Sequence, residues 1–561
     1  MLLSTMAFLH CACDGARHSR ALRHYVVAAF GSVMVGAAIA QAQPSPSVPL
    51  GDPAYAQLDQ VVGSGLVRTV IYGQRPYTRR EIARITAEAR AQLALPAHAT
   101  RVSVATRRTL ESLVRRFPAQ DDQAGLRRFA PNARTELLLL DSPSRAIPPA
   151  PVGTVQADVN PLLNARGGRR YGQGPTLAFE GGASAALGQH LLVQLQPRVA
   201  GGVATRGGRA APFLGGALQS AALSASRWNL RVDVGRQPLV WGQALDGGLL
   251  LSASGPPLDM IRVSTEAPWR APWLFKWLGM LRGSALLADL GPRQNFPHAK
   301  LAAYKLSGQI TSYFEFSASV MAQQGGRGAP TTDVWNRFID LVPALKYALP
   351  DDDSQFSNKF AGWDMRFRIP PLHGAQLYME SVFDDMDPRR WRSTWWEDGG
   401  HIVGASLAQL GPEGAWGAVA EYHHTGLRYY QHTVFSSGLS SNRTLLGDPL
   451  GPQGDGGLLR ITRDAGTRTR VQLDLALERR GGDAWGTTAD NANNDNFRFV
   501  LERARPAEWR QRAMVQWQRT MHPGTVLGVQ AGVERVRDAA SVPGVGQGNA
   551  MAGVTWMWVP Q

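Results

Sequence analysis

A short segment near residue 390 combines aromatic and cationic side chains at high density. It reads Asp387-Pro-Arg-Arg-Trp-Arg-Ser-Thr-Trp-Trp-Glu-Asp398. Aromatic faces can stack on sugar rings, and arginine forks pair with carboxylates, so this composition suits recognition of an acidic carbohydrate. The candidate ligand-binding residues are Arg389, Arg390, Trp391, Arg392, Trp395 and Trp396. Tryptophan also gathers at membrane interfaces, and for any single aromatic residue here that alternative is favoured.

Other polar clusters are weaker candidates. Tyr422-His-His424 with Arg428-Tyr-Tyr430 forms a second aromatic and cationic group. The acidic run at 351–353 could hold Ca²⁺, but it lacks the EF-hand glycine and terminal glutamate, so a solvated loop is favoured. His423 and His424 have no third ligand at a recognisable spacing. The sequence therefore predicts no metal site and no cofactor.

Catalytic signatures are also missing from the sequence. It contains no G-x-S-x-G nucleophile elbow, and its 12 histidines stand in no diagnostic serine context. A glycosidase needs only two carboxylates at a set separation, and Asp384 and Glu397 leave that possibility open. The favoured interpretation is a protein that is not an enzyme.

The composition limits the fold. The chain has 561 residues, of which 44% are hydrophobic, 18% are charged and 60 are glycine. This apolar content excludes a disordered chain. The only cysteines, Cys11 and Cys13, lie near the N-terminus, which excludes a disulfide scaffold. One large all-β structure is the interpretation that composition favours.

Residues 1–42 read as a signal peptide. Three arginines precede the apolar run 25–38, and Ala40-Gln-Ala42 supplies the small residues that a signal peptidase recognises. An uncleaved anchor helix is the alternative, but about 14 apolar residues are short for a span that needs about 20. We expect cleavage after Ala42 and export to a bacterial cell envelope.

Residues 43–140 are predicted to form a small periplasmic α-helical domain. Asp52 can cap a first helix, and Thr78-Arg-Arg-Glu81 is a capping box that opens a second. Apolar stripes at helical spacing include Leu58 and Val62, then Ile82 and Ile85. A third helix before Pro118 follows, and the proline-rich residues 141–153 form a linker.

From residue 154 to 561 the hydrophobic period changes to two. Trp363, Met365 and Phe367 alternate with polar residues, as do Leu191, Val193 and Leu195, and the pattern repeats over roughly 400 residues, including a stretch at 497–502. The strands of a soluble β-sandwich would show the same alternation. The predicted export and the length of the repeating region instead favour a large antiparallel transmembrane β-barrel, apolar toward lipid and polar toward its lumen. At about 10 residues per strand with connections of similar length, we predict roughly 18 strands, closed by residues 554–558. A barrel of this width must be plugged or must conduct.

These residues resemble the Wzi family of outer-membrane capsule-assembly proteins over nearly the whole mature chain. The segments that carry the resemblance are 53–58, 65–67 and 73–82, then Trp228–Gln237 (WNLRVDVGRQ), Trp241-Gly242, Gly248–Ser252 with Pro257, Trp363–Arg366, Leu377–Glu380 and Asp384-Asp385. The resemblance implies a large barrel with a helical bundle that helps to close it from the periplasm. It also implies a lectin that binds capsular or related polysaccharide and attaches it to the cell surface.

The charge agrees with an acidic partner. Removal of residues 1–42, which carry three arginines and one aspartate, takes the net charge from +15 to +13. Such a charge attracts acidic polysaccharide, and it also suits outer-membrane lipids and lipopolysaccharide phosphates. No nucleic-acid partner is expected, and the oligomeric state stays open. The alternatives to a lectin are a porin or solute channel and a structural barrel without a ligand.

Overall fold

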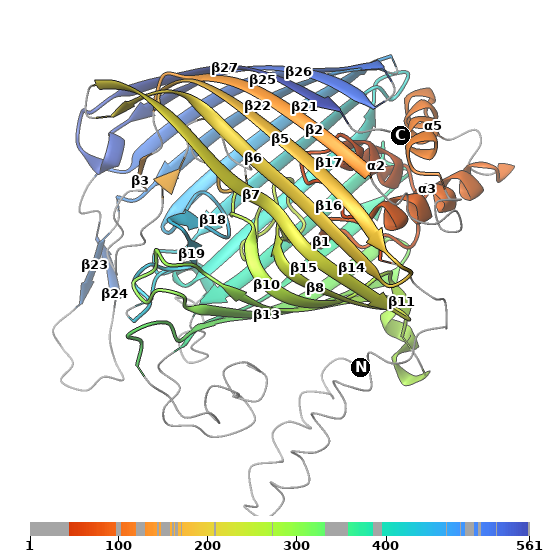
Figure 1. The fold of residues 1–561 in the computed structure, drawn as a ribbon, viewed down its shortest axis with the longest axis horizontal. Coiled ribbons are helices and arrows are strands. Elements are labelled where there is room, and N and C mark those ends of the chain that lie inside the picture. Colours follow the sequence, from red (N-terminus) through yellow and green to blue (C-terminus); the bar gives the residue numbers. More distant parts are fainter. Residues whose placement is uncertain are drawn as a thin grey trace, which may run out of the picture.

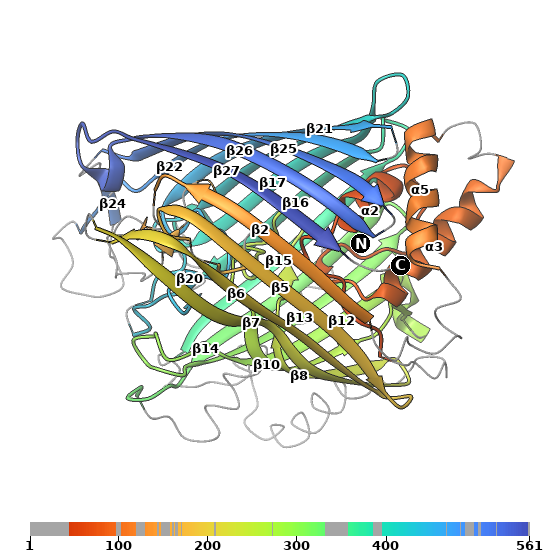
Figure 2. The same cartoon turned by 45° about the horizontal axis from the view of Figure 1, so that its top comes forward.

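The computed structural model describes residues between 44 and 558 with breaks, of which the longest cover residues 119–129, 147–157, 331–356, 385–394 and 488–498. The described chain forms a closed antiparallel β-barrel with a helical domain at one end (Figures 1 and 2). The barrel strands are β2 (Ala130–Leu140), β5 (Gly174–Leu187), β6 (Leu191–Arg206), β7 (Arg209–Arg227), β8 (Leu230–Gln237), β10 (Leu258–Thr265), β12 (Met280–Asp289), β13 (Lys300–Thr311), β14 (Phe314–Gln324), β15 (Ser357–Ile369), β16 (Ala375–Asp384), β17 (Gly399–Leu410), β18 (Trp416–Thr425), β21 (Gly454–Ala465), β22 (Thr469–Arg480), β25 (Glu508–His522), β26 (Thr525–Arg537) and β27 (Gln547–Trp558).

These eighteen strands confirm the predicted size of the barrel. A nineteenth short strand, β11 (Trp269–Arg270), pairs only with β12 and does not extend the ring. The ring closes where β27 pairs with β2, as predicted for the C-terminal strand. The stretch at 497–502 is different. Its described part, β24 (Phe499–Glu502), pairs with β23 (Ala484–Thr487) outside the ring, so the prediction that it belongs to the wall is wrong.

The first wall strand lies earlier in the chain than the sequence suggested. Residues 130–140 were assigned to the helical domain, yet β2 pairs with β27 on one side and β5 on the other. Its alternation is hidden at the end of the strand, where inward-facing Leu138 and Leu140 are apolar like their outward-facing neighbours Leu137 and Leu139. Leu138 and Leu140 pack inside the barrel against Tyr171 and Met551. The barrel therefore begins at Ala130, and the predicted linker 141–153 comes after the first wall strand in the sequence.

The outer face of the wall is an apolar surface. Leu137, Leu177 and Val533 are about half exposed on neighbouring parts of the wall, at 49%, 56% and 60%. Their chain neighbours Glu136 and Glu534 point inward and are buried. This arrangement is the apolar-out and polar-in pattern of a barrel that stands in lipid. Among the described residues, no helix is both long enough and apolar enough to cross a membrane.

Three helices of the described residues belong to the N-terminal domain: α2 (Ala54–Gly63), α3 (Arg79–Leu93) and α5 (Val104–Arg116). Asp52 accepts a hydrogen bond from the N–H of Ala54 at 2.8 Å, and Thr78 accepts one from the N–H of Glu81 at 3.2 Å, so both predicted caps form. The predicted apolar stripes meet in one core, and its members include Leu58, Val62, Ile82, Ile85, Leu110, Leu113 and Phe117.

The two ends of the barrel differ. At the helical end, adjacent strands are joined mostly by short turns, such as 188–190, 228–229 and 312–313. Helix α2 docks there so closely that a Cβ on Gly63 would lie 2.8 Å from the Cβ of Ala408. At the opposite end the connections are mostly longer, and two of them, 238–257 and 426–453, carry the short strands β9 (Val240–Trp241), β19 (Ser440–Ser441) and β20 (Thr444–Leu445).

The remaining short elements lie in the connections. They are β1 (Gln74–Arg75), β3 (Arg145–Ala146), β4 (Asp158–Val159) and the 3₁₀ helices η2 (Trp273–Leu278) and η6 (Ala539–Ser541).

Candidate functional site in the lumen and at the outer rim

Three chain segments occupy the barrel lumen, and we call residues 66–78, 238–257 and 426–453 the plug. The first reaches inward from the helical domain, and its strand β1 pairs with β9 of the second. The backbone N–H groups of Tyr72 and Gly73 both donate to the Glu315 carboxylate, each at 2.9 Å. The first segment is therefore held by the wall as well as by the rest of the plug.

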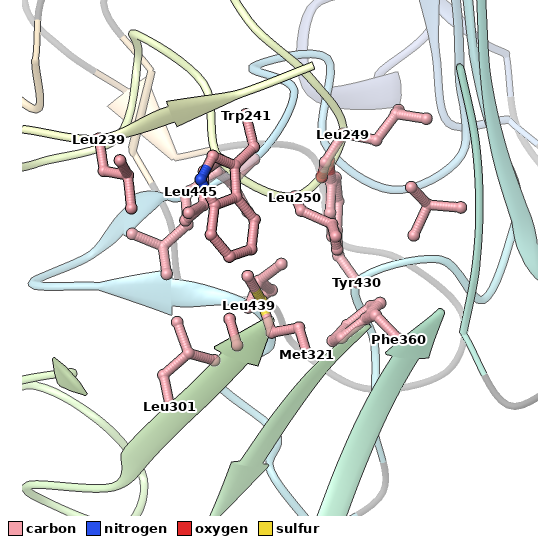
Figure 3. Close-up of a cluster of buried hydrophobic side chains, with 14 of the residues drawn as sticks. Leu239, Trp241, Leu249, Leu250, Leu301, Met321, Phe360, Tyr430, Leu439 and Leu445 are labelled. Carbon is pink, nitrogen blue, oxygen red and sulfur yellow. The ribbon is translucent and has the colours of Figure 1, made fainter. Parts of the chain in front are cut away.

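An apolar core fixes the plug to one side of the wall. Trp241, Leu249 and Tyr430 of the plug pack against inward-facing wall residues such as Met321 and Phe360 (Figure 3). The wall members of this core come from β10, β12, β13, β14, β15, β16 and β17. Truncation of a single large residue in such a core costs several kcal/mol of folding free energy. The plug is therefore an integral part of the folded barrel.

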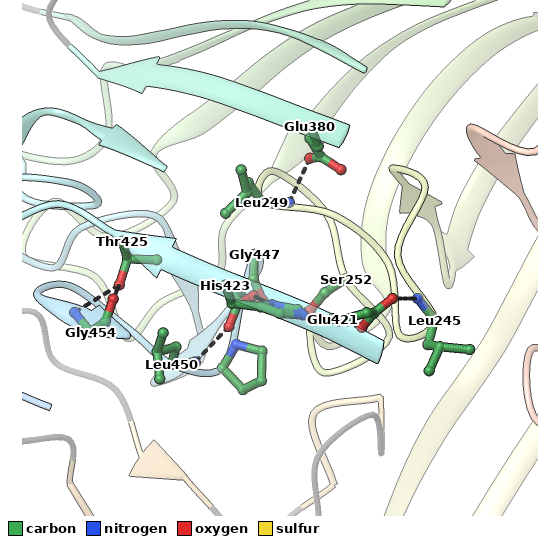
Figure 4. Close-up of polar contacts among 12 residues, drawn as sticks. Leu245, Leu249, Ser252, Glu380, Glu421, His423, Thr425, Gly447, Leu450 and Gly454 are labelled. Carbon is green, nitrogen blue, oxygen red and sulfur yellow. Dashed lines mark hydrogen bonds and ion pairs between the residues drawn. The ribbon is translucent and has the colours of Figure 1, made fainter. Parts of the chain in front are cut away.

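Wall carboxylates bind the backbone of the second plug segment. Glu380 accepts from the N–H of Leu249 at 2.7 Å, and Glu421 accepts from the N–H of Leu245 at 2.8 Å (Figure 4). These carboxylates satisfy amides that would otherwise be buried without a partner. The plug is thus held by apolar packing and by hydrogen bonds to carboxyl groups of the wall together.

Further side-chain contacts join the plug and the wall. Gln243 donates to Asp364 at 2.6 Å and accepts from Arg366 at 2.8 Å. His423 of β18 lies 2.5 Å from Asp448 of the third segment and 3.1 Å from Glu421. In the sequence, Asp364 and Arg366 alternate with apolar residues. This pattern predicts that the two side chains face the lumen, but it does not predict which residues they contact.

A cavity of about 580 Å³ remains between the plug and the other side of the wall. We call it the chamber. Most of its wall comes from β18, β21, β22, β25, β26, β27, β2 and β5, with a few residues from β6, β7, β15, β16 and β17. Its lining extends from Val526 and Met557 near the helical end to Asp246 and Asp448 of the plug. It therefore follows much of the barrel length, mainly on the side of the wall that does not contact the apolar core.

Charged groups of both signs line the chamber. Arg460 and Asp474 pair at 2.7 Å, and Arg512 pairs with Glu478. Burial raises the pKa of Asp59 on α2, and Arg366 and Arg75 offset part of that rise. Burial likewise raises the pKa of Asp246 in the plug, with Arg460 acting in the opposite direction. Such a surface can hold water or a polar solute, because hydrogen-bond donors and acceptors alternate along it.

A second polar cluster lies on the outer wall, at the end opposite the helices. Ile402 and His423 face the lumen, so their neighbours His401 and His424, which pair across β17 and β18, face outward. The indole of Trp396 stacks on His424 at a centroid distance of 3.7 Å, and that of Trp395 stacks on His401 at 4.7 Å.

Backbone contacts hold this pair of tryptophans in place. The imidazole Nε2 of His401 lies 2.6 Å from the carbonyl oxygen of Trp395, and that of His424 lies 2.8 Å from the carbonyl oxygen of Trp396. His424 is itself placed by Asp455 at 2.8 Å. Trp396 remains 50% exposed. One of its ring faces is thus supported by protein while half of its surface stays accessible.

The structure describes only some of the residues that the sequence grouped. It brings Trp395 and Trp396 together, whereas Arg389, Arg390, Trp391 and Arg392 lie outside the described residues, as does the acidic run 351–353. The second cluster is divided between environments. Tyr422 faces outward, His423 faces the chamber, and Tyr429 and Tyr430 are fully buried in the plug core. The interpretation of Tyr429 and Tyr430 as surface ligands is wrong, because a buried ring cannot meet an outside ligand.

Metal chemistry has little support in the part of the chain that is described. His423 and His424 point to opposite faces of β18, so they cannot share an ion. Across the described ranges, no group of three or more histidine, cysteine, aspartate or glutamate side chains could hold a metal ion.

Comparison with solved structures shows the same fold. The structure of Wzi from Escherichia coli, described as an outer membrane protein involved in group 1 capsule assembly and as a carbohydrate-binding β-barrel, aligns with a TM-score of 0.62 and 17% identity. The alignment covers 92% of this chain and 99% of that one. OccAB1 of Acinetobacter baumannii (10% identity) and OccD3 of Pseudomonas aeruginosa (9%) align over 77% of this chain, and over 95% and 92% of their own, with TM-scores of only 0.41 and 0.43. No curated protein sequence matches the chain.

Comparison with family profiles confirms the resemblance found in the sequence. Residues 144–551 match the profile described as capsule assembly protein Wzi. The match covers most of the chain and nearly all of the barrel, whose outward apolar face and closed ring are those of an outer-membrane protein. The chain is thus an outer-membrane β-barrel that belongs to the Wzi family of capsule assembly proteins.

Proposed function

We propose that this protein is a non-enzymatic outer-membrane lectin. It binds capsular or extracellular polysaccharide and helps to attach or assemble that polymer at the cell surface. The observation that carries the proposal is membership of the Wzi family over residues 144–551, together with the likeness of the whole fold to a barrel described as carbohydrate-binding.

The orientation of the barrel supports a surface role. Outer-membrane barrels have short turns on the periplasmic side and longer loops outside. The turns at 188–190, 228–229 and 312–313 lie at the helical end, so the helical domain belongs in the periplasm. Trp395 and Trp396 then lie at the extracellular rim.

Trp396 is the described residue best placed to meet a sugar. A half-exposed indole that is backed by His424 offers a rigid aromatic surface, and ordering it on binding costs little entropy. The proposed binding surface also includes Trp395, Arg389, Arg390, Trp391 and Arg392, which belong to the same segment of the sequence. Arginines beside an aromatic surface suit an acidic polymer.

The test measures cell-bound and shed polysaccharide in strains that carry a deletion, the wild type or point variants. Deletion should release polysaccharide into the medium. Trp396→Ala should lower retention about tenfold or less, since stacking by one aromatic residue contributes about 0.5–1.5 kcal/mol, and Trp396→Phe should recover part of it. Trp228, which is 55% exposed in a turn at the helical end, supplies the control Trp228→Ala. Unchanged retention in the deletion strain would contradict the proposed function.

The chamber supports one alternative, a solute channel. It follows much of the barrel, yet the plug crosses the lumen beside it. Planar-bilayer conductance separates the two functions, because a plugged lectin should conduct little. Gly528→Trp places an indole in the chamber, since a Cβ there meets nothing closer than 3.7 Å, and Gly548→Trp places one on the outer face as the control. A large conductance that Gly528→Trp lowers and Gly548→Trp leaves unchanged would favour the channel.

A further inference from the structure

On the outer face of the barrel, outward-facing residues change from apolar to basic at the same height on neighbouring strands near the extracellular end. On β22 the outward residue Leu477 is followed, two positions on, by Arg479, and on β26 Val533 is followed by Arg535 and Arg537. Leu477 and Val533 are 47% and 60% exposed. Because both strands change at the same end, this change marks the edge of the apolar belt that stands in lipid.

The three arginines surround one indole. Trp509, on β25, pairs directly with Arg479 on one side and with Arg537 on the other. Directly opposed residues in a sheet lie about 5 Å apart, and residues two apart on one strand lie about 7 Å apart. Three guanidinium groups therefore originate within roughly 10 Å of each other on a single face of the wall.

Two of these charges are not neutralised by the protein. Arg479 lies 3.5 Å from Asp455. Within the described part of the chain, Arg535 and Arg537 have no ion pair, and both are exposed. The nearby carboxylates Glu508 and Glu534 point into the lumen, where Arg510 contacts them.

Two outward cations elsewhere on the same rim are paired. Arg236 of β8 forms an ion pair with Asp259 of β10 at 2.5 Å, and Lys300 of β13 pairs with Asp289 of β12 at 2.6 Å. Among the described wall residues, the outward cations of the β8–β10 and β12–β13 pairs are thus compensated, whereas Arg535 and Arg537 are not, and the β22–β25–β26 sector lies far from those strands around the ring.

We infer that Arg479, Arg535 and Arg537 bind the phosphate groups of lipopolysaccharide in the outer leaflet. Guanidinium forks match phosphate oxygens in two-pronged hydrogen bonds, and an anion at this position neutralises charge that the protein leaves unpaired. Val533 and Leu477 lie directly below and offer an apolar surface for acyl chains, and Trp509 lies at the interface, where indoles are favoured. The site adjoins the Trp396 surface, because Asp455 contacts both Arg479 and His424. Arg535 and Arg537 lie on β26, beyond Trp509, and their role does not depend on polysaccharide binding.

The experiment compares variants of the full-length protein purified in mild detergent from outer membranes. Native mass spectrometry counts the lipopolysaccharide molecules retained per protein, and titration with purified lipopolysaccharide follows the rise in Tm. The double variant Arg535→Gln/Arg537→Gln should bind at least about tenfold more weakly, because it removes two charge-assisted contacts. Arg535→Lys/Arg537→Lys should retain part of the affinity.

Arg519→Gln is the matched control. Arg519 is an exposed arginine on the outward face of β25, but it lies at the helical end of the strand. Its substitution should leave retention unchanged. Lipopolysaccharide without its phosphates, and vesicles of phosphatidylglycerol, should raise the Tm much less than intact lipopolysaccharide.

Equal retention by the double glutamine variant, or equal binding of the dephosphorylated lipid or of phosphatidylglycerol, overturns the inference. Heat-modified mobility in electrophoresis confirms that each variant has formed its barrel. Polysaccharide retention by the same strains is measured separately, so a failure of this site is distinguished from a failure of the proposed function.

Discussion

The carboxylate of Glu315 accepts a hydrogen bond from the N–H of Gly73 at 2.9 Å, although the two residues lie 242 positions apart in the sequence. Glu315 belongs to the inward face of β14, and Gly73 belongs to the segment that enters the lumen from the helical domain. The approach is so close that a Cβ on Gly73 would lie 3.1 Å from Asp364, Gln243 and Ser317. A glycine backbone and a buried carboxylate together fix where the plug meets the wall.

Removal of this carboxylate should loosen the first plug segment. In Glu315→Ala, the N–H groups of Tyr72 and Gly73 lose their acceptor while they are buried, at a cost of about 1–3 kcal/mol each. We expect faster proteolysis within residues 66–78 and a rise in planar-bilayer conductance. Ser319→Ala is the control on the same face of β14, because that hydroxyl makes only a 3.5 Å contact with Gly362. If both variants behave like the wild type, the contact does not hold the plug.

The apolar core should matter more than the lipid-facing surface of the same strand. Phe360 is fully buried and meets Tyr429 edge-on at 6.1 Å, whereas Phe367, also on β15, is 44% exposed. Phe360→Ala should lower the free energy of unfolding by about 3–5 kcal/mol, because it leaves a cavity where the plug meets the wall. Phe367→Ala should cost much less.

Both phenylalanine variants are tested by thermal unfolding in detergent and by planar-bilayer conductance. We expect Phe360→Ala to lower the Tm and to raise conductance, while Phe367→Ala changes conductance little. An equal fall in Tm for both, with no change in conductance, would show that the plug does not depend on this core.

The pH dependence of stability should reveal the partly buried carboxyl of Asp59. Burial raises its pKa, so the folded state holds the proton more tightly than the unfolded state does. The stability that this group contributes is present below its ordinary pKa near 4 and is lost as the pH rises through the raised value. Asp59→Asn keeps the shape without the charge, so its Tm should equal that of the wild type near pH 4 and exceed it near pH 8.

Thermal unfolding at pH 4, 6 and 8 measures this difference. Glu111→Gln on the exposed face of α5 provides a control that should shift the Tm little at any of these pH values. A Tm below that of the wild type at pH 8 would mean that the ionised Asp59 carboxylate is held by Arg366 and Arg75 after all.

Local patterns in the sequence determined the parts of this protein that depend on near neighbours. Alternation over about 400 residues predicted the barrel and its size, and hydroxyl or carboxylate residues before apolar stripes predicted two helix starts. The motifs around Trp228 and Trp363 predicted the family. These features follow from the period of a strand, the period of a helix and the unpaired amides of a helix terminus.

Only the tertiary structure decided the contacts between distant residues, because the hydrophobic periods of strands and helices carry no information about them. Strand β2 was hidden because Leu138 and Leu140 face an apolar part of the lumen, so its polar residues stop at Glu136 and the strand ends in four leucines. Tyr429 and Tyr430 resemble loop ligands in sequence, yet their loop turns inward and buries them. The pairing of Glu315 with Gly73 and the grouping of Arg479, Arg535 and Arg537 around Trp509 arise from the register of a closed ring, which joins residues far apart in the chain and can be read only once the ring has formed.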